Sequence, residues 1–412
     1  MPDSAPADSI TTRCCIAGGG PAGMMLGLLL ARAGVDVLVL EKHADFFRDF
    51  RGDTIHPSTL EVIHELGFLE AFLRLPHQEV RELAGDIYGE HVTLADFTHL
   101  DTRCRFIAMM PQWDFLNFLA GEARRFPRFA LRMHAEATDL IETAAGVCGV
   151  KALTPEGLLD VHADLVVGAD GRHSTIRERA ALETQTLGTP IDVLWFRLPR
   201  KPEDPEATGG YVEPGSFFVM INRESYWQCG YVIRKGAFDA IRREDIAAFR
   251  ERIARVAPFT ASVVDTLENW DAVKLLTVQV DRLRQWFKPG LLCIGDAAHA
   301  MSPVGGVGIN LAIQDAVAAA NLLAAPLRKG PAHLSDLRAV QQRREWPVRM
   351  TQRVQVAVQD RVIARVLAEQ GDRAPKLPLV VRLVNRFARL RRIPARLVGI
   401  GVRPEHVAAL GR

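Results

Sequence analysis

The sequence has neither a strong net charge nor paired cysteines. Its formal net charge is +2 over 412 residues, so the chain as a whole offers no electrostatic basis for binding nucleic acid. The six cysteines are scattered, without a C-x-x-C pair or the histidine spacing of a zinc site. These absences exclude a disulfide scaffold and a zinc module, and they favour the reducing cytoplasm. No metal site is expected.

Long apolar runs are also missing. No segment has the roughly 20 apolar residues of a membrane-spanning helix, and the opening MPDSAPADSITTR lacks the apolar stretch of a signal peptide. What is present, 48% hydrophobic and 24% charged residues, is typical of a soluble globular protein with a large core. We expect a short lead-in followed directly by the fold.

The chain opens with a pattern typical of a β-α-β unit: a strand at 13–17, a helix at 21–33 and a strand at 35–40. Between the first strand and the helix, GGGPAG fits G-x-G-x-x-G. In such a turn, Gly18 permits the tight bend, Gly20 lets the backbone approach a pyrophosphate, and Gly23 lets helix and strand pack closely. The phosphates would then face the N-terminus of the helix, whose dipole and free N–H groups attract anions.

Glu41 ends the second strand, eighteen residues after Gly23. A carboxylate at this position accepts hydrogen bonds from both ribose hydroxyls and repels a 2′-phosphate. Strand, glycine turn, helix, strand and acid together predict a dinucleotide site. They leave open whether the dinucleotide is NAD or FAD.

Two later stretches, GADGRHSTIR (168–177) and GDAAHAMSPVGGVGIN (295–310), each place an aspartate directly after a small residue at a predicted strand end. With the opening turn, they make nearly the whole chain resemble the single-component flavoprotein monooxygenases of the para-hydroxybenzoate hydroxylase fold. The resemblance implies FAD. It assigns these positions to FAD binding: Gly18, Gly20, Pro21, Ala22, Gly23, Glu41, Lys42, Arg51, Gln112, Asp170, Asp296, Pro303, Gly306, Gly308, Ile309 and Asn310.

The resemblance also implies particular roles. Asp296 would hold the ribityl chain, and Asp170 would lie near the pyrophosphate. Arg51 fits the arginine on the pyrophosphate side, and Gln112, in MPQWDFLNFL, matches a position that touches the flavin. Independently of the resemblance, the glycines of GGVG leave N–H groups unshielded before a helix that begins near Ile309. That helix N-terminus would stabilise negative charge on the N1–C2=O edge of a reduced flavin.

In the family that the sequence resembles, NADH or NADPH reduces the flavin, O2 adds at C4a, and the hydroperoxide hydroxylates an electron-rich ring. We therefore expect an FAD-dependent monooxygenase that acts on an aromatic or conjugated small molecule. A second G-x-G-x-x-G and the W-x-W-x-I-P signature of flavin halogenases are absent. Two alternatives stay open: an FAD-dependent dehydrogenase or reductase on the same fold, and a non-catalytic flavin-binding protein. No residue stands out as a catalytic acid or base.

The implied fold is α/β, mixed with antiparallel sheet. It has a discontinuous Rossmann-like FAD-binding domain (1–80, 105–185 and 281–340), an inserted antiparallel-sheet substrate domain (81–104 and 186–280) and a C-terminal helical segment (341–412). The inserted segment carries strand-like aromatic runs such as VLWFRL and YWQCGYVI. Substrate contacts are expected from four of its aromatic residues: Tyr211, Phe217, Trp227 and Tyr231. The oligomeric state stays open between monomer and homodimer.

Two helical segments are predicted after the inserted sheet. A long Ala-rich helix runs from about Gly308 to Ala325 and is ended by Pro326. Further on, residues 371–412 contain ten Lys or Arg against two acids, so this tail carries +8 and the rest of the chain −6.

Within the tail, a helical period over LPLVVRLVNRFARLRR puts apolar side chains on one face, Val380, Val384, Phe387 and Leu390, and arginines on another. The favoured interpretation is a helix packed on its own domain. The alternative is contact with an anionic membrane or an acidic carrier protein.

Overall fold

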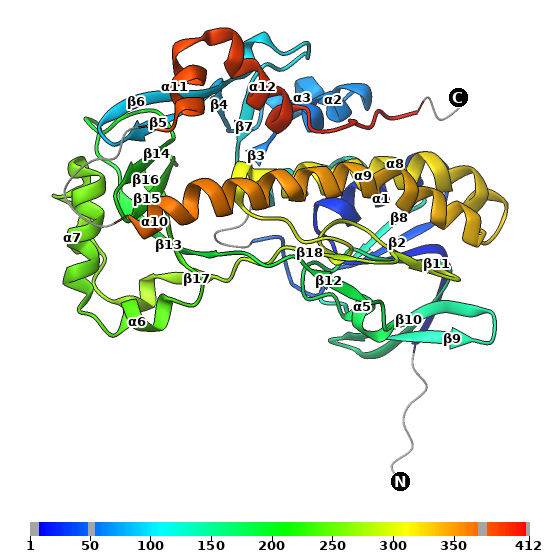
Figure 1. Ribbon diagram of the computed structural model, residues 1–412. Helices are drawn as coiled ribbons and strands as arrows, with labels where there is room; N and C mark the ends of the chain where they lie inside the picture. Colours follow the sequence, from blue (N-terminus) through cyan, green and yellow to red (C-terminus); the bar gives the residue numbers. More distant parts are fainter. Residues whose placement is uncertain (1–7, 48–53, 370–376, 409–412) are drawn as a thin grey trace.

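The computed structural model describes residues 8–47, 54–369 and 377–408, and its largest sheet has eight strands (Figure 1). The strand order is β19-β20-β11-β1-β2-β8, with β10 paired to β11 and β9 to β10. The strands are β1 (Asp8–Ala17), β2 (Val37–Leu40), β8 (Phe129–Arg132), β9 (Glu136–Thr143), β10 (Gly146–Thr154), β11 (Gly157–Gly168), β19 (Phe287–Lys288) and β20 (Leu291–Cys293). The predicted lead-in falls largely outside the described residues.

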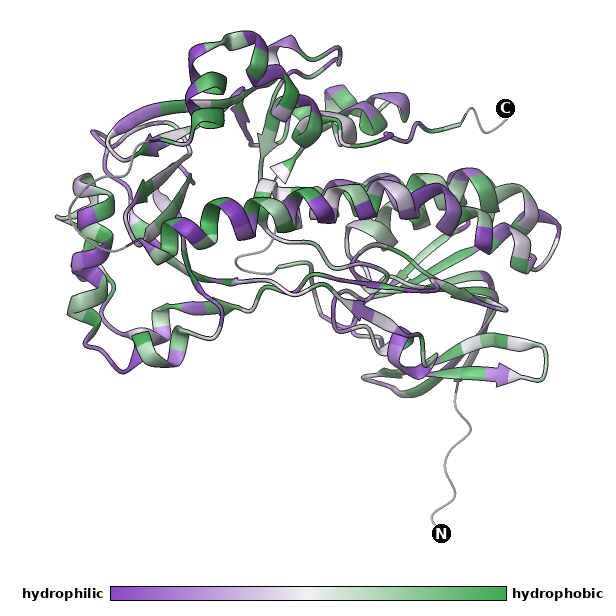
Figure 2. Ribbon diagram, in the orientation of Figure 1, coloured by the Kyte–Doolittle hydropathy of each residue, from purple (hydrophilic) through white to green (hydrophobic). Residues whose placement is uncertain are grey.

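The centre of this sheet is parallel and deeply buried. β20, β11, β1, β2 and β8 run in the same direction. The central strands are coloured mainly as hydrophobic in Figure 2. β2 reads Val-Leu-Val-Leu with all four residues buried, as expected of a strand covered on both faces. Two helices that pack on each other cover one side of it, α1 (Pro21–Arg32) and α8 (Gly308–Lys329). The β-α-β unit predicted at the start of the chain is therefore present.

A second sheet has seven strands in the order β17-β13-β16-β15-β14-β5-β6. Its members are β5 (Glu82–Ile87), β6 (Glu90–Asp96), β13 (Ile191–Pro199), β14 (Gly209–Glu213), β15 (Ser216–Asn222), β16 (Tyr226–Arg234) and β17 (Lys274–Leu276). All its pairs are antiparallel except β14 with β5, which is parallel. The exception occurs because the early β5–β6 hairpin joins the edge of a sheet built from a later segment.

The long helix after the sheets extends further than its sequence predicts. α8 runs through Pro326 to Lys329, so the expected end at Pro326 is wrong. The final turn holds because Leu327 is fully buried. One stretch of the described chain, 304–329, is long and apolar enough to cross a membrane, but 83% of its most apolar window is buried inside the protein. It is the core helix of the fold, and α9 (Leu334–Val358) packs along it.

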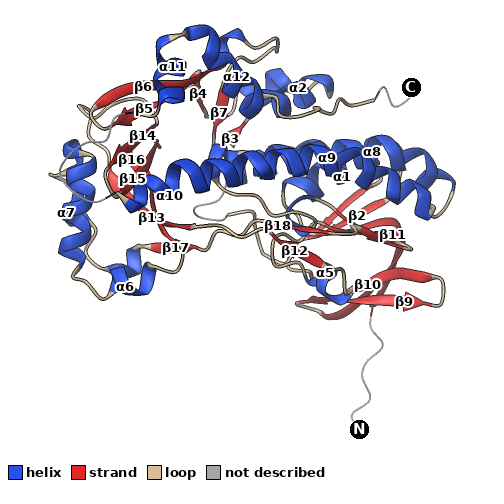
Figure 3. Ribbon diagram, viewed as in Figure 1, coloured by secondary structure: helices blue, strands red, loops and turns tan. Residues whose placement is uncertain are grey.

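The C-terminal amphipathic segment is two helices rather than the single one predicted, α11 (Leu379–Arg386) and α12 (Ala388–Gly399) (Figure 3). Phe387, at the junction, has an extended backbone, with φ −116° and ψ 102°. The guanidinium of Arg391 donates hydrogen bonds to the carbonyls of Val384 and Asn385 at the end of α11. A basic side chain on the last carbonyls stabilises a helix C-terminus, so Arg391 favours the break.

The remaining strands of the described chain form two smaller sheets. One consists of β3 (Thr54–Ile55), β7 (Ile107–Met109) and β4 (Gln78–Val80), and the other of β12 (Thr184–Thr186) and β18 (Asp281–Leu283). The remaining α-helices are α2 (Pro57–Glu65), α3 (Leu69–Leu73), α4 (Gln112–Ala123), α5 (Thr175–Arg179), α6 (Phe238–Arg242), α7 (Ile246–Val256) and α10 (Ala364–Ala368).

Candidate functional site

The carboxyl ends of four neighbouring parallel strands lie at one level of the eight-stranded sheet. Ala17 of β1 is paired with Leu40 of β2 on one side and with Gly168 of β11 on the other. Gly168 is paired in turn with Cys293 of β20. The glycine turn, Glu41 and both aspartate motifs begin at these four residues or within two residues after them. They therefore meet at one sheet edge, which is where open α/β sheets bind ligands.

The glycine turn combines two positions closed by protein with one that is open. A Cβ on Gly18, whose φ is +108°, would lie 2.4 Å from the carbonyl oxygen of Ala169. A Cβ on Gly23 would lie 2.0 Å from the carbonyl oxygen of Gly18. A Cβ on Gly20 would meet no protein atom within 4 Å. The backbone of Gly20 thus borders open space, where the pyrophosphate of a dinucleotide would approach.

Two helices begin at this edge without a side-chain cap. α1 starts after Gly20 and α8 after Val307, and neither has a capping side chain or an acid in its first turn. Nearby α5 is different, because the Ser174 hydroxyl accepts a hydrogen bond from the N–H of Arg177. The first N–H groups of α1 and α8 and their positive dipole ends remain available to an anion, whereas those of α5 are already used.

Asp170 is turned toward α5. Its Oδ1 accepts a hydrogen bond from the Ser174 hydroxyl at 2.5 Å, and its Oδ2 accepts one from the N–H of Ile176 at 3.0 Å. Burial raises the pKa of Asp170, and these hydrogen bonds oppose the shift. The residue stands at the predicted strand end, but the carboxylate holds the turn before α5.

Glu41 is held by backbone donors on both carboxylate oxygens. Oε2 accepts from the N–H of Gly19 at 3.0 Å and Oε1 from the N–H of His43 at 3.1 Å. The carboxylate is thereby fixed at the end of β2, where the sequence predicts that it accepts ribose hydroxyls. Lys42 follows it and is exposed. Arg51 lies outside the described residues.

Arg177 joins the two aspartate motifs. Its guanidinium donates to the carbonyl of Arg172 at 2.6 Å and to the carbonyl of Ala297 at 3.3 Å. Arg172 lies 3.7 Å from the Oδ2 atom of Asp296, and both side chains are about one-third exposed. The predicted ribityl-binding Asp296 is therefore accessible and positioned by the other motif. The sequence assigned Arg177 no role, although it ends the quoted stretch GADGRHSTIR.

A buried charge network supports the turn that carries Asp296. The Oδ2 atom of Asp315 accepts hydrogen bonds from the N–H of Gly295 at 3.0 Å and pairs with Nε2 of His299 at 2.6 Å. Its Oδ1 atom accepts from Nε of Arg344 at 2.9 Å. Burial favours a higher pKa for Asp315, but His299 and Arg344 outweigh it and hold the pKa below the ordinary value. No sequence motif links Asp315 and Arg344 to the turn at Gly295, because these two residues lie on α8 and α9.

The turn before α8 depends on two glycines in different ways. Gly306 has φ +63°, and a Cβ there would lie 2.6 Å from Oγ1 of Thr54, which donates to the Gly306 carbonyl at 2.9 Å. Gly308, the first residue of α8, would meet no protein atom with an added Cβ. Pro303 precedes this turn, and Ile309, which follows Gly308, is buried. The open side of the turn is thus at the helix N-terminus.

Asn310 provides a test of whether a flavin fits here. Its Oδ1 atom accepts from the Thr59 hydroxyl at 2.6 Å and from the N–H of His56 at 3.2 Å. Its Nδ2 atom is buried and has no hydrogen-bond partner within the described part of the chain. An unpaired buried donor costs about 1–3 kcal/mol, and a carbonyl at the edge of a flavin would satisfy it. The residues at this edge therefore fit FAD.

His56 is a neighbour that the sequence did not single out. It is fully buried, and its Nδ1 atom lies 2.8 Å from the carbonyl oxygen of Val398 in α12. Burial lowers its pKa to about 4, so the imidazole is neutral near pH 7. Gln112 begins α4 three residues after Met109, which is paired with Thr54. The chain thus brings Gln112 toward the Gly306 turn, while its contact with flavin stays a prediction.

The predicted substrate residues do not share one face of the seven-stranded sheet. Tyr211, Trp227 and Tyr231 belong to the cluster that packs against α7. Trp227 donates to Asp204 at 3.0 Å, and the Tyr231 hydroxyl is 2.7 Å from Ser216. Neighbouring residues of a strand point to opposite faces, and this alternation turns these three toward α7, which lies at the outer edge in Figure 1.

Phe217 lies on the other face, in a cluster with Val193, Val232 and Val304. Val304 is the residue after Pro303, so this face adjoins the turn before α8. The expectation of a single aromatic slot is therefore corrected: of the four predicted residues, Phe217 is the one on the inner face.

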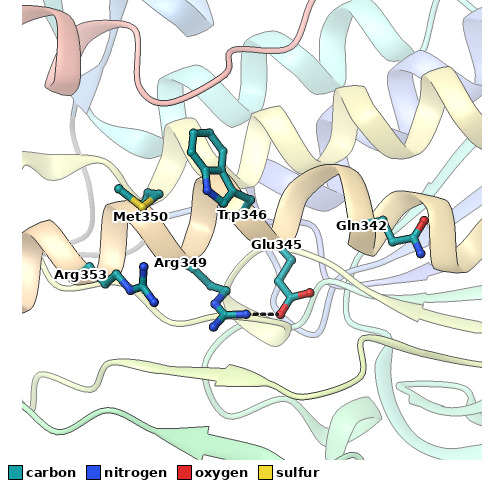
Figure 4. A pocket seen from close by; sticks show the side chains of 6 residues that line it. All are labelled: Gln342, Glu345, Trp346, Arg349, Met350 and Arg353. Carbon is teal, nitrogen blue, oxygen red and sulfur yellow. Dashed lines mark hydrogen bonds and ion pairs between the residues drawn. The ribbon is translucent and has the colours of Figure 1, made fainter.

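A separate surface pocket of about 380 Å³ lies along α9 (Figure 4). It is lined by Gln342, Glu345, Trp346, Arg349, Met350 and Arg353. None of these residues belongs to the turns that meet at the sheet edge. The pocket is therefore distinct from the candidate dinucleotide site.

Comparison with known proteins gives a consistent picture. The model of the FAD binding domain family matches residues 11–354. The chain is 33% identical to 6-methylpretetramide 4-monooxygenase of Streptomyces rimosus over 91% of its own length and 90% of the relative's. Anhydrotetracycline hydroxylase from Streptomyces rimosus superposes with a TM-score of 0.74 and 25% identity, covering 96% of this chain and 77% of that one. Para-nitrophenol 4-monooxygenase from Pseudomonas putida superposes with a TM-score of 0.74 at 19% identity, covering 96% and 100%, and supports the fold alone. The chain belongs to the FAD-dependent aromatic monooxygenases of the para-hydroxybenzoate hydroxylase fold.

Proposed function

We propose that this monooxygenase uses NADH or NADPH and O2 to hydroxylate a polycyclic aromatic compound of the polyketide type. The observation that carries the proposal is the sheet edge, where α1 and α8 begin without caps and α8 carries the buried, unpaired Nδ2 atom of Asn310. Such an edge binds the anionic and carbonyl groups of a flavin dinucleotide. The substrate class rests on the relative named 6-methylpretetramide 4-monooxygenase.

The predicted residues have separate binding roles in this proposal. The N-terminus of α1, opened by Gly20, binds the pyrophosphate, and Glu41 accepts the ribose hydroxyls. Asp296 contacts the ribityl chain. The N-terminus of α8 and the Nδ2 atom of Asn310 bind the N1–C2=O edge and stabilise negative charge there. Once bound, FAD supplies hydride acceptance from the nicotinamide and activation of oxygen.

The protein's contribution is to orient the ring system and exclude water. The inner face of the seven-stranded sheet is apolar where Phe217, Val193 and Val232 pack with Val304. A substrate held between this face and the turn before α8 is shielded from bulk water, which limits unproductive side reactions. His56 remains neutral near pH 7 and adds no positive charge to the site.

The pairing of strands supports a division into domains. β5 and β6, from 82–96, join strands from 191–276 in one sheet, whereas β19 and β20 return to the sheet begun by β1. We propose that residues 1–80, 105–185 and 281–340 form the FAD-binding domain, that 81–104 and 186–280 form the substrate domain, and that 341–412 form a helical segment.

Isotope labelling tests the reaction. Purified protein should contain FAD, and polycyclic phenols should stimulate its oxidation of NADH or NADPH. Under ¹⁸O2, the product should gain one labelled oxygen atom. Unlabelled product, or equal turnover with another electron acceptor in the absence of oxygen, would support a dehydrogenase instead.

A pair of variants on α8 tests the flavin site without relying on turnover. Asn310→Asp replaces the unpaired donor with a negative charge, so it should weaken FAD binding and lower the midpoint potential of the bound flavin. Asn321→Asp, further along the same helix, is the matched control, because its amide bonds to the backbone at 406–408. Equal effects of the two variants would remove Asn310 from the site.

A further inference from the structure

The C-terminal helices α11 and α12 expose apolar side chains. Leu379 is 63% exposed, Val380 70%, Phe387 53% and Ile393 67%, and Leu383 is also exposed. We call these five residues, with Arg382, Arg386, Arg389, Arg392 and Arg396, the α11–α12 surface. Single exposed apolar residues are ordinary, but a group on two consecutive helices marks an interaction site.

α11 is hydrogen-bonded to β6 through Asn385. The amide of Asn385 accepts from the N–H of Thr93 at 3.1 Å and donates to the carbonyl of His91 at 3.2 Å, both on β6. No side chain of α11 is buried. The helix thus lies on β6, as the favoured interpretation of a packed helix expects, but Leu379, Val380 and Leu383 face away from the fold. α12 also packs, since Ala395 and Gly399 are buried.

The charge of the surface is of one sign. Among the described residues, none of its five arginine side chains has an ion-pair or hydrogen-bond partner, and all five are exposed. The sequence from 373 to 404 contains no acid. Arg391, by contrast, is occupied by its hydrogen bonds at the end of α11. The positive charge of the tail is thus concentrated beside the exposed apolar side chains.

We propose that the α11–α12 surface docks on an anionic lipid membrane. Apolar side chains flanked by arginines are the pattern of a helix that lies in the interface plane, with its apolar face in the headgroup–acyl boundary. Arginine stems lie along apolar surface while the guanidinium reaches phosphate. A second copy of this chain is disfavoured, because a two-fold contact would place the same unpaired arginines against each other.

Docking at this surface would bring the lipid close to the segment that contacts Asn310 in the candidate flavin site. The carbonyl of Val398 in α12 accepts a hydrogen bond from Nδ1 of His56, whose backbone N–H donates to Asn310. The membrane would therefore adjoin the segment that leads to the flavin site, and an apolar substrate dissolved in lipid would reach the enzyme there. Binding to lipid does not require turnover, so the proposal stands apart from the proposed reaction.

Vesicle sedimentation of the FAD-loaded protein tests the arginines. The protein should sediment with phosphatidylglycerol vesicles and not with phosphatidylcholine vesicles, and added salt should weaken binding. Arg382→Gln combined with Arg386→Gln should weaken it about 25-fold, because each arginine near an anionic surface contributes about a factor of five. The matched control is Arg242→Gln with Arg243→Gln, on and beside α6, which should bind like the unaltered protein.

A second pair of variants tests the apolar side chains. Val380→Gln with Phe387→Gln should weaken binding at least about 10-fold, because these side chains lose their transfer into lipid. Leu153→Gln with Leu158→Gln, exposed on the β10–β11 hairpin, is the control. The melting temperature and FAD content of every variant should match those of the unaltered protein.

Three results of the binding assays would overturn the proposal. They are the absence of binding to phosphatidylglycerol vesicles at low salt, equal losses in test and control variants, and binding of an acidic protein without binding of vesicles. A concentration-dependent dimer that disappears with the arginine variants would assign the surface to a second copy and would also overturn it.

Discussion

The two large sheets prepare binding surfaces from different parts of the chain. At the edge of the eight-stranded sheet, the binding groups are mostly backbone: bare glycines, free N–H groups at two helix starts, and turns tied by buried ion pairs. On the inner face of the seven-stranded sheet, they are apolar side chains such as Phe217. A backbone site tolerates almost no change of residue type at its glycines, whereas a side-chain site is specified by which face of a strand each residue occupies.

The largest loss of folded protein should come from replacing Gly23, where the protein's own backbone leaves no room for a side chain. Gly23→Ala would place a Cβ 2.0 Å from the Gly18 carbonyl, so the variant should yield no soluble FAD-bound protein. Gly20→Ala meets no protein atom and should fold with an unchanged melting temperature when free of FAD. It should nevertheless bind FAD more weakly by about 1–3 kcal/mol if a ligand occupies the open space. FAD titration and thermal melts of both variants measure this contrast, and normal FAD affinity of Gly20→Ala would contradict the assignment.

Two neighbouring phenylalanines compare the faces of the second sheet directly. Phe218 is fully buried against α7, so Phe218→Ala should destabilise the protein by about 3–5 kcal/mol. Phe217, on the inner face and partly buried, should cost about 1–2 kcal/mol as Phe217→Ala and should raise the KM for the aromatic substrate. Urea unfolding and steady-state kinetics separate the two. A raised KM in Phe218→Ala but not in Phe217→Ala would indicate that the substrate binds on the face covered by α7.

Mutating the buried charge network of Asp315 should destabilise the protein more than mutating a surface ion pair. Asp315→Asn leaves Arg344 and His299 buried without their carboxylate, so we expect a loss of about 3–5 kcal/mol in the free energy of unfolding. Asp164→Asn breaks the partly exposed pair with Arg13 and should cost less than about 1 kcal/mol. FAD affinity should fall only in the first variant, since Asp315 holds the Gly295 turn. Similar unfolding curves for both would argue against the network.

A smaller effect should appear in the pH dependence of the free energy of unfolding. It should come from His56, which directly precedes α2 and is hydrogen-bonded to Val398 of the sequence-distant α12. Burial lowers its pKa from 6.5 to about 4, so between these pH values the unfolded chain binds more protons than the folded one. Stability should therefore fall as the pH is lowered from about 6.5 to about 4, by about 3 kcal/mol from this group. His56→Gln should flatten that part of the profile, and the exposed control His162→Gln should not. Unfolding free energies measured across this range decide the point.

Residues whose role follows from backbone geometry were readable from the sequence. Gly18 and Gly23 are required by the turn itself, and the strand ends that carry Glu41 and Asp296 follow from short apolar runs. The same reasoning failed for Trp227 and Tyr231, because composition identifies an aromatic strand but not which face is covered by α7. Their roles depend on which face of the sheet each side chain occupies, and tertiary packing decides which face is covered by α7.

Long-range partners were invisible for a different reason. Asp315 and Arg344 lie on two helices, and nothing in either helix indicates that Arg344 pairs with the carboxylate that holds Gly295. The break at Phe387 also arises from a contact, the guanidinium of Arg391 on the last carbonyls of α11, rather than from a helix-breaking residue. Gln112 and Arg51 stay predictions as flavin and pyrophosphate contacts.

The return of β20 to the sheet begun by β1 has a consequence for biosynthesis. A ribosome that has made only the first half of the chain has released β1, α1, β2 and β11, but neither β20 nor α8. The nascent chain then lacks the strand that covers β11 and the second open helix start. Domains tend to fold as units while the chain emerges, but this one cannot close until Cys293 and the residues beyond it have left the exit tunnel. FAD should therefore bind only late in synthesis. The supply of FAD at that stage should govern what fraction of the newly made protein escapes aggregation and proteolysis.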